Sequence, residues 1–209
     1  MSAPNEIELE FVGRAARLSA GGIAAACAIL GIGEAELRAV LAVESLGSGF
    51  LADGRPKILF ERHWFHRLTG GRFSADHPDI SDAKPGGYKG GVAEYERLGG
   101  AIALDRKAAL DSASWGLGQI MGFNAAKAGF VDAEAMIRAF AEGEDAQVLG
   151  VARFIAASGA GRHLAAHDWA AFARVYNGPR FRDNAYDEKL QLAYDRLVRE
   201  TAAGVLDQA

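Results

Sequence analysis

The chain has 209 residues, of which 50% are hydrophobic and 24% charged. This composition is typical of a folded globular protein of one or at most two domains and excludes a disordered chain. Lysine and arginine number 23 against 27 acidic residues, a formal net charge of −4. Because nucleic-acid binding needs a positive field at the phosphate backbone, we expect no nucleic-acid partner.

The N-terminal segment is acidic and contains Pro4, which is the wrong composition for a secretory signal peptide. The longest apolar stretch, residues 21–33, is too short to cross a bilayer. We therefore expect synthesis in a cytoplasm without an export signal, and no stable membrane insertion. The single cysteine, Cys27, lies in an apolar run and is expected to be a buried, inert thiol.

Helical periodicity dominates the chain, in blocks separated by glycine. In the block 34–45, Leu37, Val40 and Leu41 share one face, and acidic residues in the first turn suit the helix dipole. We expect helices over residues 18–30, 34–45, 92–98, 102–110, 124–128, 132–141, 144–157, 168–175 and 182–203.

One segment departs from this pattern. Within residues 56–62, Ile58 and Phe60 alternate with other residues as in a short strand. Residues 70–91 are rich in proline and glycine and predict a long loop or hairpin, of a length more often found at functional sites. No repeat or linker divides the chain, so we expect one mostly α domain, residues 1–209, with a small β-hairpin patch.

Glu44 is the first candidate catalytic residue. It falls on the stripe that Leu37 and Val40 direct toward the core, near the end of its helix. Burial and the negative end of the helix dipole both raise the pKa of a carboxyl in that position. A carboxyl kept protonated near neutral pH suits a general acid. The alternative is a surface glutamate at a frayed helix end.

Glu61 is the second candidate and shares a strand face with Leu59. A chain that folds back to bring Glu61 opposite Glu44 provides the two carboxylates of glycoside hydrolysis. One protonates the leaving oxygen and the other acts as base or nucleophile. The alternative is an ion pair of Glu61 with Arg62, Arg55 or another nearby cation.

Two further segments carry candidate binding residues. In residues 112–124, small residues permit a close approach of backbone to ligand, Trp115 offers a surface for a sugar or for the core, and Gln119 offers a donor and an acceptor. A packed helix entry is the alternative interpretation. Tyr176 and Asn177 end a helix, and Asn177 is alternatively a simple C-cap.

Three motifs in order resemble those of goose-type lysozymes and lytic transglycosylases: Glu44-Ser45, Ser-Trp-Gly-Leu-Gly-Gln-Ile at 114–120, and Tyr-Asn-Gly at 176–178. Residues 43–50, 58–65 and 114–124 further resemble the N-acetylmuramidase domain of phage and prophage endolysins, and the resemblance extends over residues 18–197. It implies a lysozyme-like fold beside an active-site cleft. The reaction would be hydrolysis of the β-1,4 bond between N-acetylmuramic acid and N-acetylglucosamine in peptidoglycan.

The resemblance also implies residue roles. Glu44 would be the general acid, and Glu61 would take the place of the second catalytic carboxylate and activate water. The expected substrate-binding residues are Gln119, Tyr176, Asn177, Ser114, Tyr88 and His63. We expect a monomer without cofactor or metal and without a separate wall-binding module, which binds peptidoglycan glycan strands after release from the host cytoplasm.

Two departures from the family pattern stand out. The third residue of the Gly-Leu-Met-Gln motif is Gly118, which predicts a wider cleft at that point. The interval from Glu44 to Gln119 is longer than in simple goose-type enzymes, and the intervening segment is shared with the endolysin muramidases.

Two other functions remain as alternatives. A lytic transglycosylase uses one acid/base and does not require Glu61. A non-catalytic wall-binding or phage structural module on the same scaffold needs neither glutamate, because a fold alone does not imply an activity.

Histidine and cation clusters allow weaker hypotheses. The pairs His63/His66 and His163/His167 have helical spacing but lack the glutamate of a zinc-protease motif, so surface or core histidines are expected rather than metal ligands. A run of cations predicts either a local basic patch for an anionic wall or an ordinary solvated surface; it comprises Arg55, Lys57, Arg62, Arg67 and Arg72.

Overall fold

The computed structural model describes residues 11–44, 47–179 and 181–206. This part of the chain is mostly helical, as expected. The α-helices are α2 (Ala20–Leu30), α3 (Glu34–Glu44), α4 (Arg62–Leu68), α5 (Ala93–Leu104), α6 (Arg106–Asp111), α7 (Ala133–Glu142), α8 (Glu144–Ser158), α9 (Gly161–Ala165), α10 (Trp169–Tyr176) and α11 (Tyr186–Leu206). The strands are β1 (Ile58–Phe60), β2 (Ala113–Trp115) and β3 (Ile120–Met121), and the 3-10 helices are η1 (Gly122–Asn124) and η2 (Phe181–Asn184).

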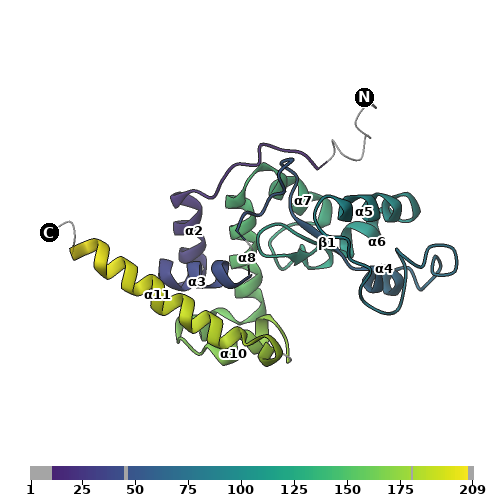
Figure 1. Ribbon diagram of the computed structural model, residues 1–209. Helices are drawn as coiled ribbons and strands as arrows, with labels where there is room; N and C mark the ends of the chain where they lie inside the picture. The colour runs from purple at the N-terminus through teal and green to yellow at the C-terminus, as the bar shows by residue number, and fades with distance from the viewer. Residues whose placement is uncertain (1–10, 45–46, 180, 207–209) are drawn as a thin grey trace.

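Helix α8 lies between two groups of elements (Figure 1). On one side are α2, α3, α10 and α11, and on the other are the sheet and α4 to α7. Val148 and Ala152 of α8 pack with residues of α2 and α3, whereas Val151 and Ile155 belong to the larger core. A helix that is apolar on more than one face is suited to this central position.

The three strands form one antiparallel sheet in the order β1-β2-β3. Ile58 pairs with Trp115, and both side chains are buried in the core. Side chains alternate along a strand, so the intervening residues face the other side. There Ser114 lies between Leu59 of β1 and Met121 of β3. This second face leads toward the candidate site. The expected small β patch is thus present, as a sheet of three strands.

The helix boundaries differ from the sequence prediction around α5 and α6. A break was expected at the glycines 99 and 100, but α5 continues through them to Leu104. Gly100 allows close packing, since a Cβ there would lie 2.7 Å from Ile80 Cδ1. The break comes at Asp105, whose side chain accepts a hydrogen bond from the Ala108 amide and so begins α6.

Several short elements and element boundaries also differ from the sequence prediction. The expected helix over residues 124–128 is a turn that follows η1, and the last helix begins at Tyr186 after η2 rather than at 182. Helices α4 and α9 and strands β2 and β3 were not predicted. All of these elements are short, so they carry little periodicity of their own.

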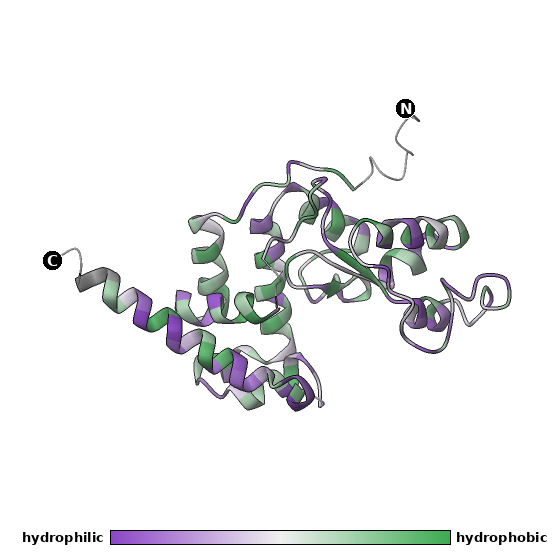
Figure 2. Cartoon of the chain, in the orientation of Figure 1, coloured by the Kyte–Doolittle hydropathy of each residue, from purple (hydrophilic) through white to green (hydrophobic). Residues whose placement is uncertain are grey.

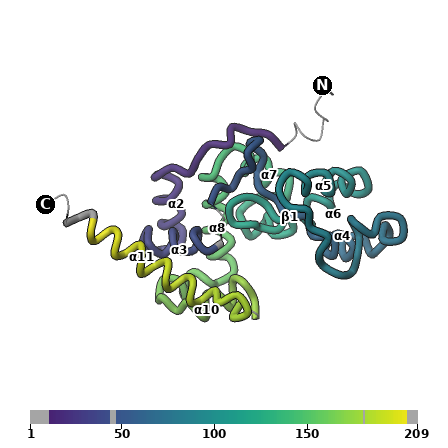
Figure 3. Tube along the Cα trace, in the orientation of Figure 1, coloured from purple at the N-terminus to yellow at the C-terminus, as the bar shows by residue number. Residues whose placement is uncertain are grey.

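The segment between α4 and α5 is the expected long loop, and it extends away from the helices (Figure 3). Figure 2 shows α2 almost uniformly apolar, whereas α11 alternates polar and apolar residues. Cys27 on α2 is half-buried rather than buried, and partial burial together with nearby Glu34 raises the pKa of its thiol. Within the described residues, no helix is long and apolar enough to cross a membrane.

Candidate active site

Glu61 occupies the junction between β1 and α4. Strand β1 ends at Phe60, two residues before the end of the predicted segment 56–62, and Glu61, which was expected on the strand, is the N-cap residue of α4 with extended backbone (φ −98°, ψ 91°). Its amide donates to the Ser112 carbonyl at 3.0 Å, which fixes the backbone to the segment before β2. Its side chain makes no capping hydrogen bond to α4 and is directed to other partners.

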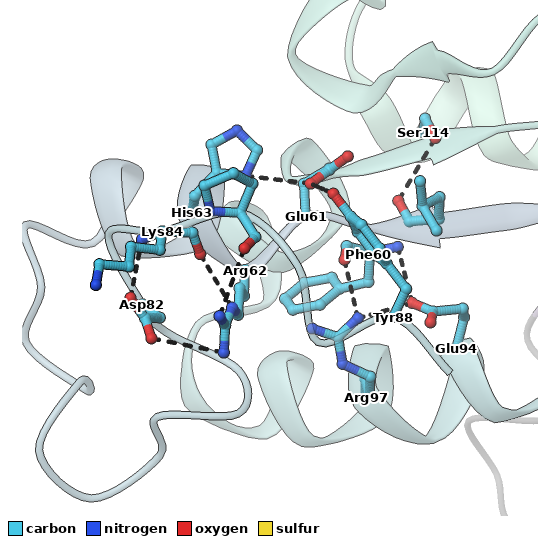
Figure 4. A network of polar contacts seen from close by, with 12 residues as sticks. Phe60, Glu61, Arg62, His63, Asp82, Lys84, Tyr88, Glu94, Arg97 and Ser114 are labelled. Carbon is cyan, nitrogen blue, oxygen red and sulfur yellow. Dashed lines mark hydrogen bonds and ion pairs between the residues drawn. The ribbon is translucent and has the colours of Figure 1, made fainter. Parts of the chain in front are cut away.

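Two of the predicted binding residues meet at the Glu61 carboxylate (Figure 4). The Tyr88 hydroxyl donates to Glu61 Oε2 at 2.7 Å, and His63 Nδ1 lies 3.1 Å from the same oxygen. The Glu61 side chain is 16% exposed. Among the described residues no donor contacts Oε1. Oε2 is therefore bound by the Tyr88 hydroxyl, while Oε1 keeps its hydrogen-bonding capacity with respect to the described residues.

The alternative ion pairs of Glu61 with Arg55 and Arg62 do not form. Arg55 is buried and binds Asp53 at 2.6 Å, and its guanidinium lies over the Tyr95 ring. Arg62 lies 3.5 Å from Asp82 and donates to carbonyls of the long loop. Both cations stabilise local structure, so neither adds a free charge to the predicted basic patch.

The environment of Tyr88 keeps its phenol neutral. Burial, the hydrogen bond to Glu61 and the negative charge of Glu61 together raise the pKa of Tyr88 to about 12. Tyr88 is therefore a hydrogen-bond donor to the carboxylate throughout the neutral range. A donor with no charge of its own can orient Glu61 without forming an ion pair with it.

A buried ion pair supports the backbone on both sides of this contact. The Glu94 and Arg97 side chains are 0% and 2% exposed and lie 2.9 Å apart. Glu94 accepts hydrogen bonds from the amides of Phe60, Lys89 and Gly90, which directly precede Glu61 or follow Tyr88. Arg97 donates to the Phe60 carbonyl at 3.0 Å (Figure 4).

The pKa of Glu94 reflects these contacts. Burial alone raises the pKa of a carboxyl, but the amides of Gly90, Lys89 and Phe60 and the charge of Arg97 outweigh burial and lower it. Glu94 is thus a stable anion inside the protein. Its charge is matched by donors from both segments that carry Glu61 and Tyr88.

A second buried carboxylate, Glu144, binds the segment that follows α3. Glu144 Oε1 accepts from Ser48 Oγ and from the Gly49 amide, each at 2.8 Å, and Oε2 accepts from the Leu18 amide at 2.9 Å. Burial raises the pKa of Glu144, but these hydrogen bonds outweigh burial and lower it. The Gly49 carbonyl accepts from the Lys57 amide at 2.8 Å, so this segment is joined to the start of β1.

Glu44 itself ends α3. Its side chain and residues 45 and 46 lie outside the described residues, so its predicted burial and its role stay predictions. The described neighbours on its helix face, Leu37 and Val40, are both fully buried. The end of α3 therefore leads from the core into the segment that Glu144 binds.

The structure also brings Ser114 and Gln119 together. Ser114 Oγ donates to Gln119 Oε1 at 2.9 Å, and Gln119 Nε2 donates to the Gly116 carbonyl at 2.8 Å. Gln119 has φ 47°, an uncommon conformation for a residue other than glycine. Trp115 is 0% exposed and donates to the Leu110 carbonyl, so it is a core residue and not a sugar-binding surface.

Gly118 does not widen the cleft, contrary to the prediction. A Cβ there would lie 2.2 Å from Val151 Cγ2 and 3.8 Å from Tyr176 Oη. The space is filled by α8, and the glycine permits this close approach. Tyr176, stacked on Phe172, thus reaches the motif that contains Gly118, and Asn177 is the C-cap of α10.

Two further histidines of the predicted pairs have polar partners of their own. His66 Nδ1 contacts Ser74 Oγ, and His167 Nε2 lies 2.7 Å from Glu36 Oε1. Among the described residues, no three His, Cys, Asp or Glu side chains are grouped to hold a metal ion.

Comparisons with known proteins identify the family. A family model described as N-acetylmuramidase matches residues 33–198. The chain belongs to the N-acetylmuramidase family. The crystal structure of the Burkholderia AP3 phage endolysin is similar, with a TM-score of 0.82 and 40% sequence identity over 88% of this chain and 72% of that chain. A comparison with curated proteins gave no match. The expected lysozyme-like fold and glycoside hydrolase class are confirmed.

Sequence reasoning missed Glu94 and Glu144 in this N-acetylmuramidase. Each stands in the first turn of a helix, where an acidic residue is ordinarily explained by the helix dipole and by solvent exposure. The only local signal was the spacing of Glu94 and Arg97, three residues apart on one helix face. The backbone donors that both carboxylates bind come from distant segments.

Gly118→Ala should destabilise the protein by about 1–3 kcal/mol, because the new methyl group meets the stiff β-branched Val151. Urea unfolding measures this loss, and Val151→Ala in the same chain should recover much of it. Gly21→Ala is the matched control, since its Cβ would meet nothing closer than Ser19 Oγ at 3.5 Å. A Gly118→Ala protein as stable as the parent contradicts the close packing.

Glu94→Gln should lower the free energy of unfolding at neutral pH by about 3 kcal/mol, because it leaves the buried Arg97 charge unmatched. The folded pKa of Glu94 lies below its ordinary 4.5, so its contribution is present above that value and is lost as pH falls through the folded pKa. Urea unfolding of Glu94→Gln at several pH values should therefore show a weaker acid dependence than the parent.

Glu96→Gln is the control for this experiment, because Glu96 lies on the same helix and its side chain is 74% exposed. It should leave stability nearly unchanged. Equal losses in the two variants would contradict the role of the buried pair.

Tyr88→Phe should lower the hydrolysis rate roughly tenfold, because it removes one hydrogen bond to a charged acceptor. The rate ratio of parent to variant should be constant between about pH 5 and about pH 9, since a phenol with a pKa of about 12 does not ionise there. Initial rates on purified peptidoglycan measure this ratio. A ratio that approaches one at alkaline pH would show that Tyr88 ionises and would contradict the assignment.

Proposed function

We propose that this N-acetylmuramidase hydrolyses peptidoglycan as an endolysin, with Glu44 as general acid and Glu61 as the carboxylate that activates water. The family match and the likeness to a phage endolysin support the substrate and the biological role. The observation that carries the residue assignment is the geometry of Glu61. The Tyr88 hydroxyl donates to its Oε2 and His63 Nδ1 lies 3.1 Å from that oxygen, while Oε1 has no donor among the described residues.

The reaction proceeds by cleavage of the β-1,4 glycosidic bond. Glu44 gives its proton to the glycosidic oxygen, and that oxygen leaves with the bonding electron pair. Glu61 Oε1 accepts a proton from a water molecule, whose oxygen forms the new bond to the anomeric carbon. The transition state has oxocarbenium character, and the ionised Glu61 also stabilises its positive charge.

Ser114, Gln119, Tyr176 and Asn177 have the supporting role of holding the glycan. The Ser114 to Gln119 hydrogen bond fixes the amide of Gln119 on the same face of the sheet as Leu59. Tyr176 approaches Gly118 from α10, the opposite side of this segment. Donors and acceptors from the sheet and from α10 thus meet at the segment 114–119, and we assign them to binding of the polar glycan chain.

A lytic transglycosylase needs only one acid/base, because the muramic 6-hydroxyl replaces water. The buried support that Glu94 and Arg97 give to the Glu61 segment favours a hydrolase that uses a second carboxylate. We also propose that the chain acts as a monomer with a single catalytic domain, and that its place of action is the cell wall.

Glu44→Gln and Glu61→Gln should each reduce hydrolysis by roughly 100-fold or more, the scale of general acid/base catalysis. Mass spectrometry of digested peptidoglycan is the measurement, and parent products should carry reducing N-acetylmuramic acid ends. Glu96→Gln serves as control. Dominant anhydro-muropeptides would overturn the hydrolase assignment, and an undiminished rate in either variant would remove that glutamate from the mechanism.

A further inference from the structure

A row of aromatic side chains leads away from Glu61. His63 lies beside Glu61, its ring centre is 5.7 Å from that of Trp64, and Trp64 is 4.7 Å from Phe123. His63 and Trp64 lie on α4, and Phe123 lies on η1, directly after β3. The row therefore links the start of α4 to the segment that directly follows β3.

These rings are accessible where other aromatic residues are not. Phe123 is 37% exposed and Trp64 is half-buried, whereas Trp115 is fully buried. The Arg67 guanidinium lies 5.1 Å from the Trp64 ring centre and holds that ring in place. Two fixed, partly exposed aromatic faces in contact are a surface on which the apolar C–H face of a sugar ring can pack.

A cavity of about 600 Å³ opens beside Phe123, between α6, η1 and the start of α7. This volume is within the usual range of small-molecule sites. Charged pairs border the cavity: Lys107 lies 2.6 Å from Asp111, and Arg106 lies 2.7 Å from Glu134. Hydrogen-bond donors and acceptors thus stand next to an aromatic base.

The charges of this cavity favour a neutral ligand. Two cations face three carboxylates in its lining, namely Arg106, Lys107, Asp111, Asp132 and Glu134. With one more carboxylate than cations, this set offers no excess positive charge to the carboxylates of a stem peptide. It does offer both donors and acceptors to hydroxyl and acetamido groups.

We propose that Trp64, Phe123 and the adjoining cavity form a distal binding site for N-acetylhexosamine units of the glycan strand, beyond the bond that is cleaved. The inference rests on the proposed function, because the same strand is cut at Glu61. Its support is the unbroken line of contacts from Glu61 through His63 and Trp64 to Phe123. Long strands would reach this site, whereas short fragments bound at Glu61 would not.

Intrinsic fluorescence provides a direct test. Of the three tryptophans, Trp115 and Trp169 are 0% and 6% exposed, so Trp64 is the one that a ligand can contact. Peptide-free glycan strands are titrated into the Glu61→Gln protein, which binds without cleavage. We expect the emission to change on binding. Phe123→Leu keeps an apolar side chain but removes the flat ring. It should raise the strand concentration needed for half-saturation several-fold, up to about tenfold.

Two controls accompany the titration. Leu192→Ala, at a side chain 66% exposed on α11, should leave binding unchanged. A tetrasaccharide should bind Phe123→Leu and the parent equally. Equal binding of long strands by Phe123→Leu and the parent would overturn the proposal. A loss seen only with peptide-bearing strands would also overturn it and would identify the stem peptide as the occupant.

Activity separates this proposal from the proposed function. In the otherwise unaltered enzyme, Phe123→Leu should raise KM for long strands several-fold and leave kcat nearly unchanged. Cleavage with an unchanged KM would refute the distal site and leave the hydrolase assignment intact. Binding that depends on Phe123 in a protein that does not cleave peptidoglycan would refute the hydrolase assignment and leave the distal site intact.

Discussion

The buried ion pair of Glu94 and Arg97 is the interaction on which the candidate site depends. Removing two charges from water costs free energy. The pair is stable because Glu94 also accepts hydrogen bonds from three backbone amides and Arg97 donates hydrogen bonds to two backbone carbonyls. These backbone amides and carbonyls belong to the end of β1 and to the long loop, where regular secondary structure does not supply hydrogen-bond partners for all of them. The pair therefore fixes the positions from which Glu61 and Tyr88 meet.

Glu144 has the same function on the other side of the site. It binds the amide and hydroxyl of the segment after α3, whose irregular backbone cannot satisfy its own donors. The segment after Glu44 therefore donates an amide hydrogen bond to the buried Glu144, and the residue before Glu61 donates one to the buried Glu94. This arrangement gives irregular segments a fixed geometry, which a general acid and a base require relative to one substrate.

The sequence was sufficient for the long helices, because their apolar residues recur with helical period. It also singled out Glu61, Tyr88 and His63, which the structure brings together and whose roles stay predictions. Their contact was not predictable, since residues 61 and 88 lie 27 positions apart in the sequence and their backbone segments are held together by Glu94, which the sequence did not single out. Gly118 was misread for a similar reason: sequence shows a missing side chain, whereas only the fold shows Val151 in that space. Short elements such as α4 and β2 depend on pairing with distant segments and carry no local signal of their own.

Hydrogen exchange followed by NMR, in the parent and in Glu94→Gln, tests the central claim most directly. If the buried pair fixes the site, the amides of Phe60, Lys89 and Gly90 exchange slowly and together in the parent. All three then lose their protection in Glu94→Gln, while core amides of α8 keep theirs. Exchange of these three amides at the rate of exposed loop amides in the parent would contradict the claim.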